Sequence, residues 1–165
     1  MKNTNLQFEI EMLIYSEKEG DYWDFKREYN DNKSDLLHDI ICMANNRADR
    51  DAYIIYGVED ETYKIIGVEN NPNRKNQQKI IDFLKDKEFA GGVRPQVELR
   101  TLRINNHEVD VLIIKNSKDT PYYLTKRFDK VAAYNIYTRV VDTNTPIDKS
   151  ADINHVEYLW KIVSC

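Results

Sequence analysis

Residues 52–68 read AYIIYGVEDETYKIIGV, and this stretch decides the class of fold. It holds two runs of β-branched and aromatic residues, Ala52–Val58 and Tyr63–Val68, joined by a short acidic segment. Such runs at such a spacing are typical of a β-hairpin. The first run predicts a central strand, in which alternate residues from Ile54 to Val58 share one face.

Helical and alternating patterns surround this pair of strands. Helices are expected over residues 4–16, over 34–45 with Ser34 as the cap, around 80–84, and after a capping Asp152. Further strands are expected at residues 22–29, 97–104, 109–114, 122–125 and 132–141, with Asn105-Asn106 as a tight turn. Because strands and helices interleave irregularly, we expect an α+β fold: a mixed, mostly antiparallel sheet of about five or six strands flanked by helices.

Length and composition indicate one folded domain. The 165 residues, 41% of them hydrophobic, suit a single domain over residues 1–165. The expected core is 17–146 with a helix packed at each end, and a longer parent protein is compatible with the last helix. No apolar run approaches the roughly 20 residues of a spanning helix, so no membrane partner is expected. Cys42 and Cys165 form no metal-type pair, which predicts a reducing compartment, the cytoplasm.

Charge is distributed unevenly along the chain. The formal net charge is −4, yet residues 1–60 hold 7 Lys/Arg against 14 Asp/Glu, whereas residues 94–139 hold 9 against 5. A basic segment of this kind can contact phosphates, and the acidic segment can have a different role. A solvated charged face is the alternative explanation.

The segment EGDYWDFK at residues 19–26 contains several acidic residues. In a strand, Asp24 and Lys26 point to one face and the two aromatic residues beside them to the other. Glu19 on the entry loop and Asp60 after the next strand could join Asp24. Three converging carboxylates commonly hold a divalent cation for phosphodiester cleavage. An ordinary salt bridge between Asp24 and Lys26 is the alternative.

Several of these segments together resemble a known family. They are Glu19 with Asp24-Phe25-Lys26, Ala44-Asn45-Asn46, Ile54–Asp60, Ile65–Val68, Asp110–Ile114, Thr120–Tyr123, and Ile136–Arg139 leading to Asp142–Pro146. In this order and spacing the chain resembles the Schlafen AlbA-like domain over roughly residues 17–146.

The resemblance implies a DNA-binding domain, and many bacterial members carry an ATP-binding label. Some Schlafen proteins are metal-dependent endoribonucleases that use a cluster of acids. Carried over to this chain, the resemblance implies that Glu19, Asp24 and Asp60 are catalytic and bind Mg²⁺ or Mn²⁺, with Glu59 competing for the third place. Lys26 would stabilise the scissile phosphate.

Three positions depart from the family pattern. Asp24 stands where a glutamate is common, residues 46–51 (NRADRD) replace a Gly-Gly pair, and Val141 replaces a glycine. The last two changes affect the backbone of any phosphate-binding loop. ATP is not expected, because the chain has no Gly-Lys-Ser/Thr loop.

The late basic segment supplies the binding prediction. Lys and Arg neutralise phosphates and Tyr stacks on unpaired bases, although tyrosines also simply favour strands. The residues predicted to bind nucleic acid are Lys126, Arg127, Lys130, Tyr137, Arg139 and Asn144. Nucleic-acid binding, RNA or DNA, is therefore the first hypothesis. A metal-dependent endoribonuclease is the second, and a nucleotide-binding or protein-interaction module is the third. The sequence leaves a homodimer open.

Overall fold

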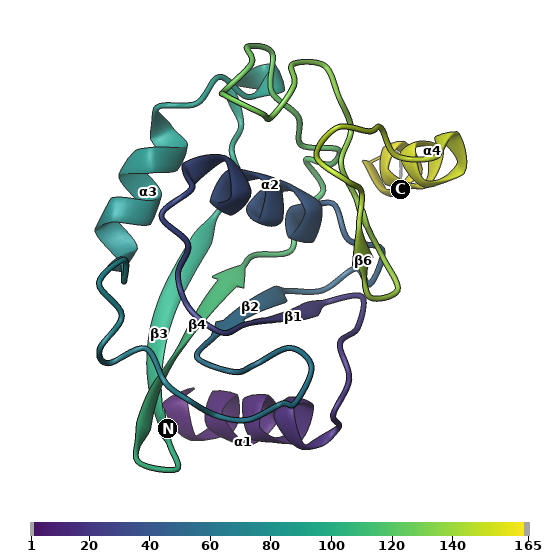
Figure 1. The fold of residues 1–165 in the computed structure, drawn as a ribbon. Coiled ribbons are helices and arrows are strands. Elements are labelled where there is room, and N and C mark those ends of the chain that lie inside the picture. The colour runs from purple at the N-terminus through teal and green to yellow at the C-terminus, as the bar shows by residue number, and fades with distance from the viewer. Residues whose placement is uncertain (1, 164–165) are drawn as a thin grey trace.

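The computed structural model describes residues 2–163. Its elements are α1 (Lys2–Tyr15), β1 (Trp23–Lys26), α2 (Lys33–Ala44), β2 (Ala52–Tyr56), α3 (Gln77–Lys85), a 3₁₀ turn (Ala90–Gly92), β3 (Val97–Ile104), β4 (His107–Ile114), β5 (Arg139–Val140), β6 (Thr143–Asn144) and α4 (Ile153–Val163), as Figure 1 shows. Within this described part of the chain, no helix has both the length and the apolar character needed to cross a membrane.

The main sheet is mixed, which confirms the predicted α+β class. Its strand order is β1-β2-β4-β3. β1 lies parallel to β2, and the other two pairs are antiparallel. β5 and β6 form a separate two-stranded sheet. The main sheet therefore has four strands, somewhat fewer than the sequence suggested.

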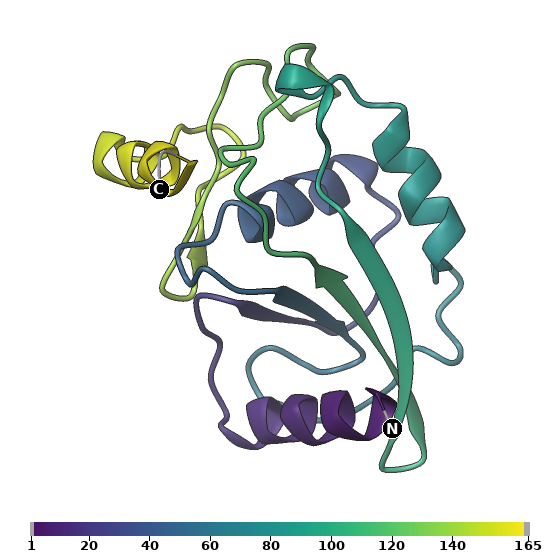
Figure 2. The ribbon, with the colours of Figure 1, turned by 180° about the vertical axis from the view of Figure 1, so that it is seen from behind.

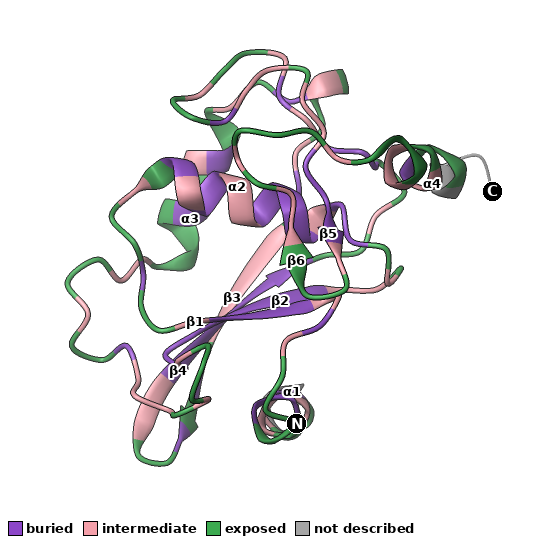
Figure 3. Cartoon of the chain, turned by 45° about the vertical axis from the view of Figure 1, so that its right-hand side comes forward, coloured by how far each residue is buried: buried purple, intermediate pink, exposed green. Residues whose placement is uncertain are grey.

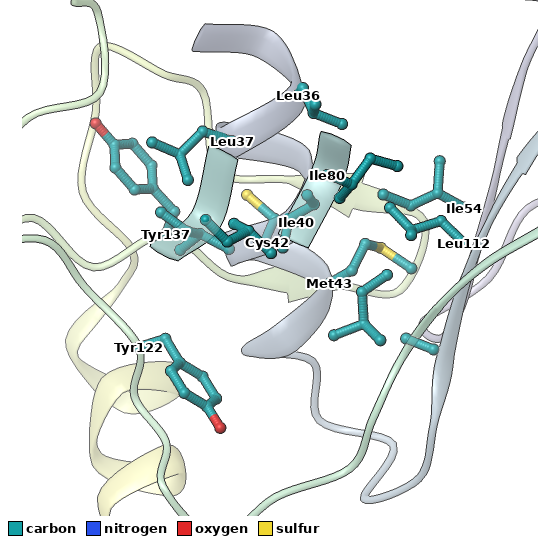
Figure 4. Close-up of a cluster of buried hydrophobic side chains, with 14 of the residues drawn as sticks. Leu36, Leu37, Ile40, Cys42, Met43, Ile54, Ile80, Leu112, Tyr122 and Tyr137 are labelled. Carbon is teal, nitrogen blue, oxygen red and sulfur yellow. The ribbon is translucent and has the colours of Figure 1, made fainter. Parts of the chain in front are cut away.

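Helices cover both faces of this sheet (Figures 1 and 2). On one face, α2 and α3 bury a cluster in which Ile40 and Met43 approach Ile54 and Leu112 (Figure 4). On the other face, α1 covers a second cluster. The sheet is thus buried from both sides, and the loops at its ends carry most of the exposed residues (Figure 3).

Gly57 ends the central strand earlier than predicted. It has a φ of +108°, in the region that favours glycine. The N–H groups of Gly57 and Val58 both donate to the carbonyl of Lys26, at 2.7 and 3.2 Å. The turn reverses the alternation, so Val58 belongs to the core under α1 while Ile54 and Tyr56 face α2. The expectation that all three share one face was wrong.

Two predicted strands are irregular segments. Residues 63–68 pair with the predicted strand before them through the isolated Val58–Ile65 bridge alone. Residues 122–125 form one isolated bridge, between Leu124 and Phe89. The expected strand over 132–141 is reduced to the two residues of β5. By contrast, Asn105 and Asn106 have φ of +51° and +64°, the pattern of a type I′ hairpin turn, as predicted.

Asn32, and not Ser34, caps α2. The Oδ1 atom of Asn32 accepts from the backbone N–H of Ser34 at 2.9 Å and of Asp35 at 3.4 Å. The Ser34 hydroxyl instead donates to Asp129 at 2.5 Å. Cys42 of this helix is buried, and Cys165 lies outside the described residues.

Candidate nucleic-acid interface

A closed loop over residues 124–134 carries three of the predicted phosphate-binding residues. The N–H of Tyr134 donates to the carbonyl of Leu124 at 2.7 Å, which closes the loop. Within it, Phe128 and Val131 exchange two backbone hydrogen bonds, and Val131 is buried in the core beside α2. This anchoring leaves Lys126, Arg127 and Lys130 exposed, as predicted. We call residues 124–134 the basic loop.

Two hollows adjoin the basic loop. One, of about 400 Å³, is lined by Arg127, Lys130, Ala132, Asn135, Ile147, Asp148, Lys149 and Ser150. The other, also of about 400 Å³, is lined by Lys85, Lys87, Glu88, Phe89, Gly92, Arg94 and Thr125. Cations from three separate segments therefore gather at this end of the molecule. In Figure 1 it is the end opposite α1.

Arg139 does not belong to this surface, because it is only 2% exposed. Its Nε donates to the carbonyl of Gly20 at 3.0 Å and its Nη2 to that of Trp23 at 2.9 Å. Its Nη1 lies 3.3 Å from Asp24 Oδ1, and its Nη2 lies 3.3 Å from Glu19 Oε2. The expectation of an exposed, phosphate-binding Arg139 was wrong. This guanidinium instead ties β5 to the segment that enters β1.

Tyr137 and Asn144 both form hydrogen bonds with other groups of the fold. Tyr137 is fully buried, and its hydroxyl donates to the carbonyl of Ile147 at 2.8 Å. Asn144 accepts from Arg139 Nη1 at 3.0 Å and donates to Asp39 at 3.3 Å. Tyr137 is therefore not part of the exposed surface, whereas Asn144 is partly exposed and its predicted contact with nucleic acid stays a prediction.

Asp24 lies at the centre of a buried charge network on the α2 face of β1. Lys26 Nζ is 3.1 Å from Asp24 and 3.4 Å from Asp39 of α2. Burial acts to raise the pKa of Asp24. The charge of Lys26, a hydrogen bond with Glu19 and the charge of Arg139 outweigh this effect and hold the pKa below its ordinary value. Burial would lower the pKa of Lys26, but Asp39 and Asp24 raise it, so this ammonium stays charged.

Glu19 completes the network, and its surroundings favour the protonated form of its carboxyl group. Its burial, its hydrogen bond with Asp24 and the charge of Asp24 raise its pKa to about 8, against the effect of Arg139. The raised pKa favours the protonated form of the Glu19 carboxyl group near neutral pH, while Asp24 favours the charged form. Glu19 also lines an open pocket of about 570 Å³ together with Arg47, Val141 and Tyr158.

The predicted third acid does not join this pair. Asp24 is level with Ile54 in the middle of β2, whereas Asp60 is exposed and follows four residues after the end of that strand. Glu59 pairs with Arg27 at 3.1 Å. Among residues 2–163, no three His, Cys, Asp or Glu side chains form a group that could hold a metal ion.

A metal cation would need the positions beside the carboxyl groups of Glu19 and Asp24. Lys26 and Arg139 occupy these positions. The arrangement does not fit a three-carboxylate metal site, so the predicted convergence of the acids was wrong. The catalytic and metal-binding roles of Glu19, Asp24, Lys26 and Asp60 stay predictions.

Asp39 is the member of the network that sequence reasoning missed. It lies three residues after Leu36 and four before Met43, both of which are buried in the core. An acid at this spacing within the buried stripe of an amphipathic helix needs a partner, which was the available signal. Burial raises the pKa of Asp39, Lys26 opposes this effect, and the charge of Asp24 adds to it.

Fold and site together define a small α+β domain with a buried arginine–carboxylate network at the β1 edge and a basic loop at one end. The family model described as Schlafen, AlbA_2, matches residues 19–148. The chain belongs to this family, as its sequence resemblance suggested. Membership supports a nucleic-acid-related domain.

Two solved structures are similar to this chain. The N-terminal domain of a RecG-related protein from Nitrosomonas europaea matches with a TM-score of 0.51 and 16% identity, over 78% of this chain and 84% of that one. The DIP2311 protein from Corynebacterium diphtheriae matches with a TM-score of 0.47 and 21% identity, over 76% of this chain. This chain spans 22% of the length of the Corynebacterium chain. No curated protein matches the sequence.

Proposed function

We propose that this domain binds nucleic acid and that Lys126, Arg127 and Lys130 of the basic loop contact its phosphates. The observation that supports this proposal is the exposure of all three cations on one anchored loop of a chain whose net charge is −4. Membership of the Schlafen, AlbA_2 family supports the same class of ligand.

The charge distribution favours one orientation of the ligand. A polyanion is attracted to the basic loop and repelled by the first 60 residues, in which acids outnumber bases by 14 to 7. Each phosphate that a Lys or Arg neutralises releases condensed counterions from the nucleic acid. Affinity therefore depends on salt according to the number of such contacts.

A salt titration of oligonucleotide binding tests the proposal. In the double variant Lys126→Ala/Arg127→Ala, two phosphate contacts are lost. The slope of log affinity against log salt should become shallower by about 1.4 for a single strand and about 1.8 for duplex DNA. Binding at low salt should also weaken. Fluorescence anisotropy with labelled RNA and DNA measures both quantities.

Lys18→Ala/Lys64→Ala is the matched control, because it removes the same charge from two exposed residues outside the basic loop. It should leave the slope close to that of the wild type. If the basic-loop variant keeps the wild-type affinity and slope, the basic loop is not the contact surface. Nucleic-acid binding by this domain then loses its support.

A further inference from the structure

Tyr134 is an exposed aromatic residue at the end of the basic loop. It is 72% exposed, whereas Tyr122 and Tyr137 of the same region are buried at 4% and 0%. Among the tyrosines that interleave with the late cations, Tyr134 therefore presents the most ring surface to solvent. Tyr123 lies beside it, with the two ring centroids 6.3 Å apart.

The backbone holds this ring in place at a cost. Tyr134 has a φ of +57°, which is uncommon for a bulky residue. Its N–H is fixed by the bond to Leu124 that closes the basic loop. Burial of the side chain does not compensate for this conformation, because the ring stays in water. Strained residues that packing does not explain concentrate at binding sites.

Asn135 follows Tyr134 in the chain and lines the same hollow as Arg127 and Lys130. Its side-chain amide donates to the carbonyl of Lys149 at 2.6 Å. Lys149 adds a third cation to this hollow, against the single carboxylate of Asp148. An exposed aromatic residue thus directly precedes, along the chain, a residue that lines a cationic hollow. Single-stranded nucleic acids are bound by this combination, because their bases stack on rings while their phosphates contact cations.

We propose that the domain binds single-stranded nucleic acid, with an unpaired base stacked on Tyr134 and the adjoining phosphates held by Arg127, Lys130 and Lys149. This inference rests on the proposed function and narrows its ligand. A duplex offers phosphates to the same cations but keeps its bases stacked on one another, so Tyr134 distinguishes the two ligands.

The test compares wild type, Tyr134→Ala, Tyr134→Phe and the control Tyr15→Ala in anisotropy titrations. The probes are oligouridine, oligothymidine and a DNA duplex of matching length. Tyr15 is the control because it is also exposed but belongs to α1, on the other side of the sheet. Tyr134→Ala should weaken single-strand binding roughly 5- to 150-fold, the range of one base–aromatic stack. Tyr134→Phe and Tyr15→Ala should bind as the wild type does.

Two further readouts separate stacking from damage to the loop. The salt slope of Tyr134→Ala should equal that of the wild type, because no charge is lost, whereas Lys149→Ala should flatten it by about 0.7. Duplex affinity of Tyr134→Ala should also stay unchanged. Loss with oligouridine, oligothymidine or both supports the inference and shows which sugar is accepted.

Unchanged single-strand affinity in Tyr134→Ala overturns the inference and leaves the proposed function standing. An equal loss of single-strand and duplex affinity also overturns it, because the variant has then disturbed the basic loop. Wild-type protein that binds none of the three probes removes the proposed function and this inference together.

Discussion

Val141 occupies a backbone conformation that its side chain opposes. It is the first residue of the two-residue turn between β5 and β6, with a φ of +59°. A β-branched residue is rare there, and a hairpin turn with positive φ at this position usually has glycine. The Schlafen AlbA-like pattern also has glycine at this place. Its side chain is 69% exposed, so little packing compensates for the strain.

Replacing Val141 by glycine should therefore stabilise the domain. We expect the free energy of unfolding to rise by about 1 kcal/mol, the relief of strain exceeding the extra freedom that glycine gives the unfolded chain. Urea unfolding followed by circular dichroism measures the change. The matched control Val140→Gly, one residue earlier in β5, should lower stability, because glycine in a strand costs about 0.5–1 kcal/mol. A Val141→Gly midpoint below that of the wild type would show that the turn is not strained.

At the scale of elements, the C-terminus of α2 organises segments that lack regular structure. Asn45 follows the last residue of α2 and is fully buried. Its Nδ2 donates to the carbonyls of Tyr122 and Tyr137 at 2.8 and 2.9 Å, and its Oδ1 accepts from the N–H of Tyr122 at 2.8 Å. One side chain thus satisfies backbone groups that strand pairing would otherwise satisfy.

Asn45→Asp should destabilise the domain strongly with almost no change of shape. The carboxylate cannot donate to either carbonyl and places a charge in a buried site, so we expect a loss of roughly 3 kcal/mol or more. Thermal and urea unfolding measure it. Asn46→Asp is the neighbouring control: it removes a single donated bond, to the carbonyl of Met43 at 2.7 Å, and should cost less. Equal losses would argue against the role of Asn45 as the clamp.

The stability of the whole molecule should depend on pH through Glu19. Its pKa is raised from 4.5 to about 8 in the folded state. Between these values the folded chain binds a proton that the unfolded chain releases, so stability falls as pH rises. Asp24 acts in the opposite sense, because its lowered pKa makes stability fall as pH drops below the ordinary value of 3.8. The two windows do not overlap.

Glu19→Gln should remove the pH dependence of stability that lies between pH 4.5 and about 8. Glutamine keeps a donor toward Asp24 but cannot ionise, so the melting temperature of the wild type should fall relative to the variant as pH rises from 4.5 to about 8. The raised pKa of Asp39 acts in the same direction in both proteins. Parallel pH profiles of wild type and variant would contradict a protonated Glu19.

Features that depend on neighbouring residues could be predicted from the sequence. The alternation of the EGDYWDFK segment places Asp24 and Lys26 on one face of β1, and Trp23 and Phe25 in the opposite core. The periodicity of α2 and the Asn105-Asn106 turn were also correct. These are local properties, because the geometry of a strand, helix or turn repeats within a few residues.

The roles of the charged residues depended on contacts that are distant in sequence. Lys126 and Arg139 look alike as cations of one basic segment, yet the first is exposed and the second is buried against Asp24, 115 positions away. Asp60 was expected beside Asp24, but Asp39 takes that place because α2 packs over β1. Burial of a charge is decided by which segments meet across the fold. No local pattern records this, so only the tertiary structure could separate the structural arginine from the cations available to a ligand.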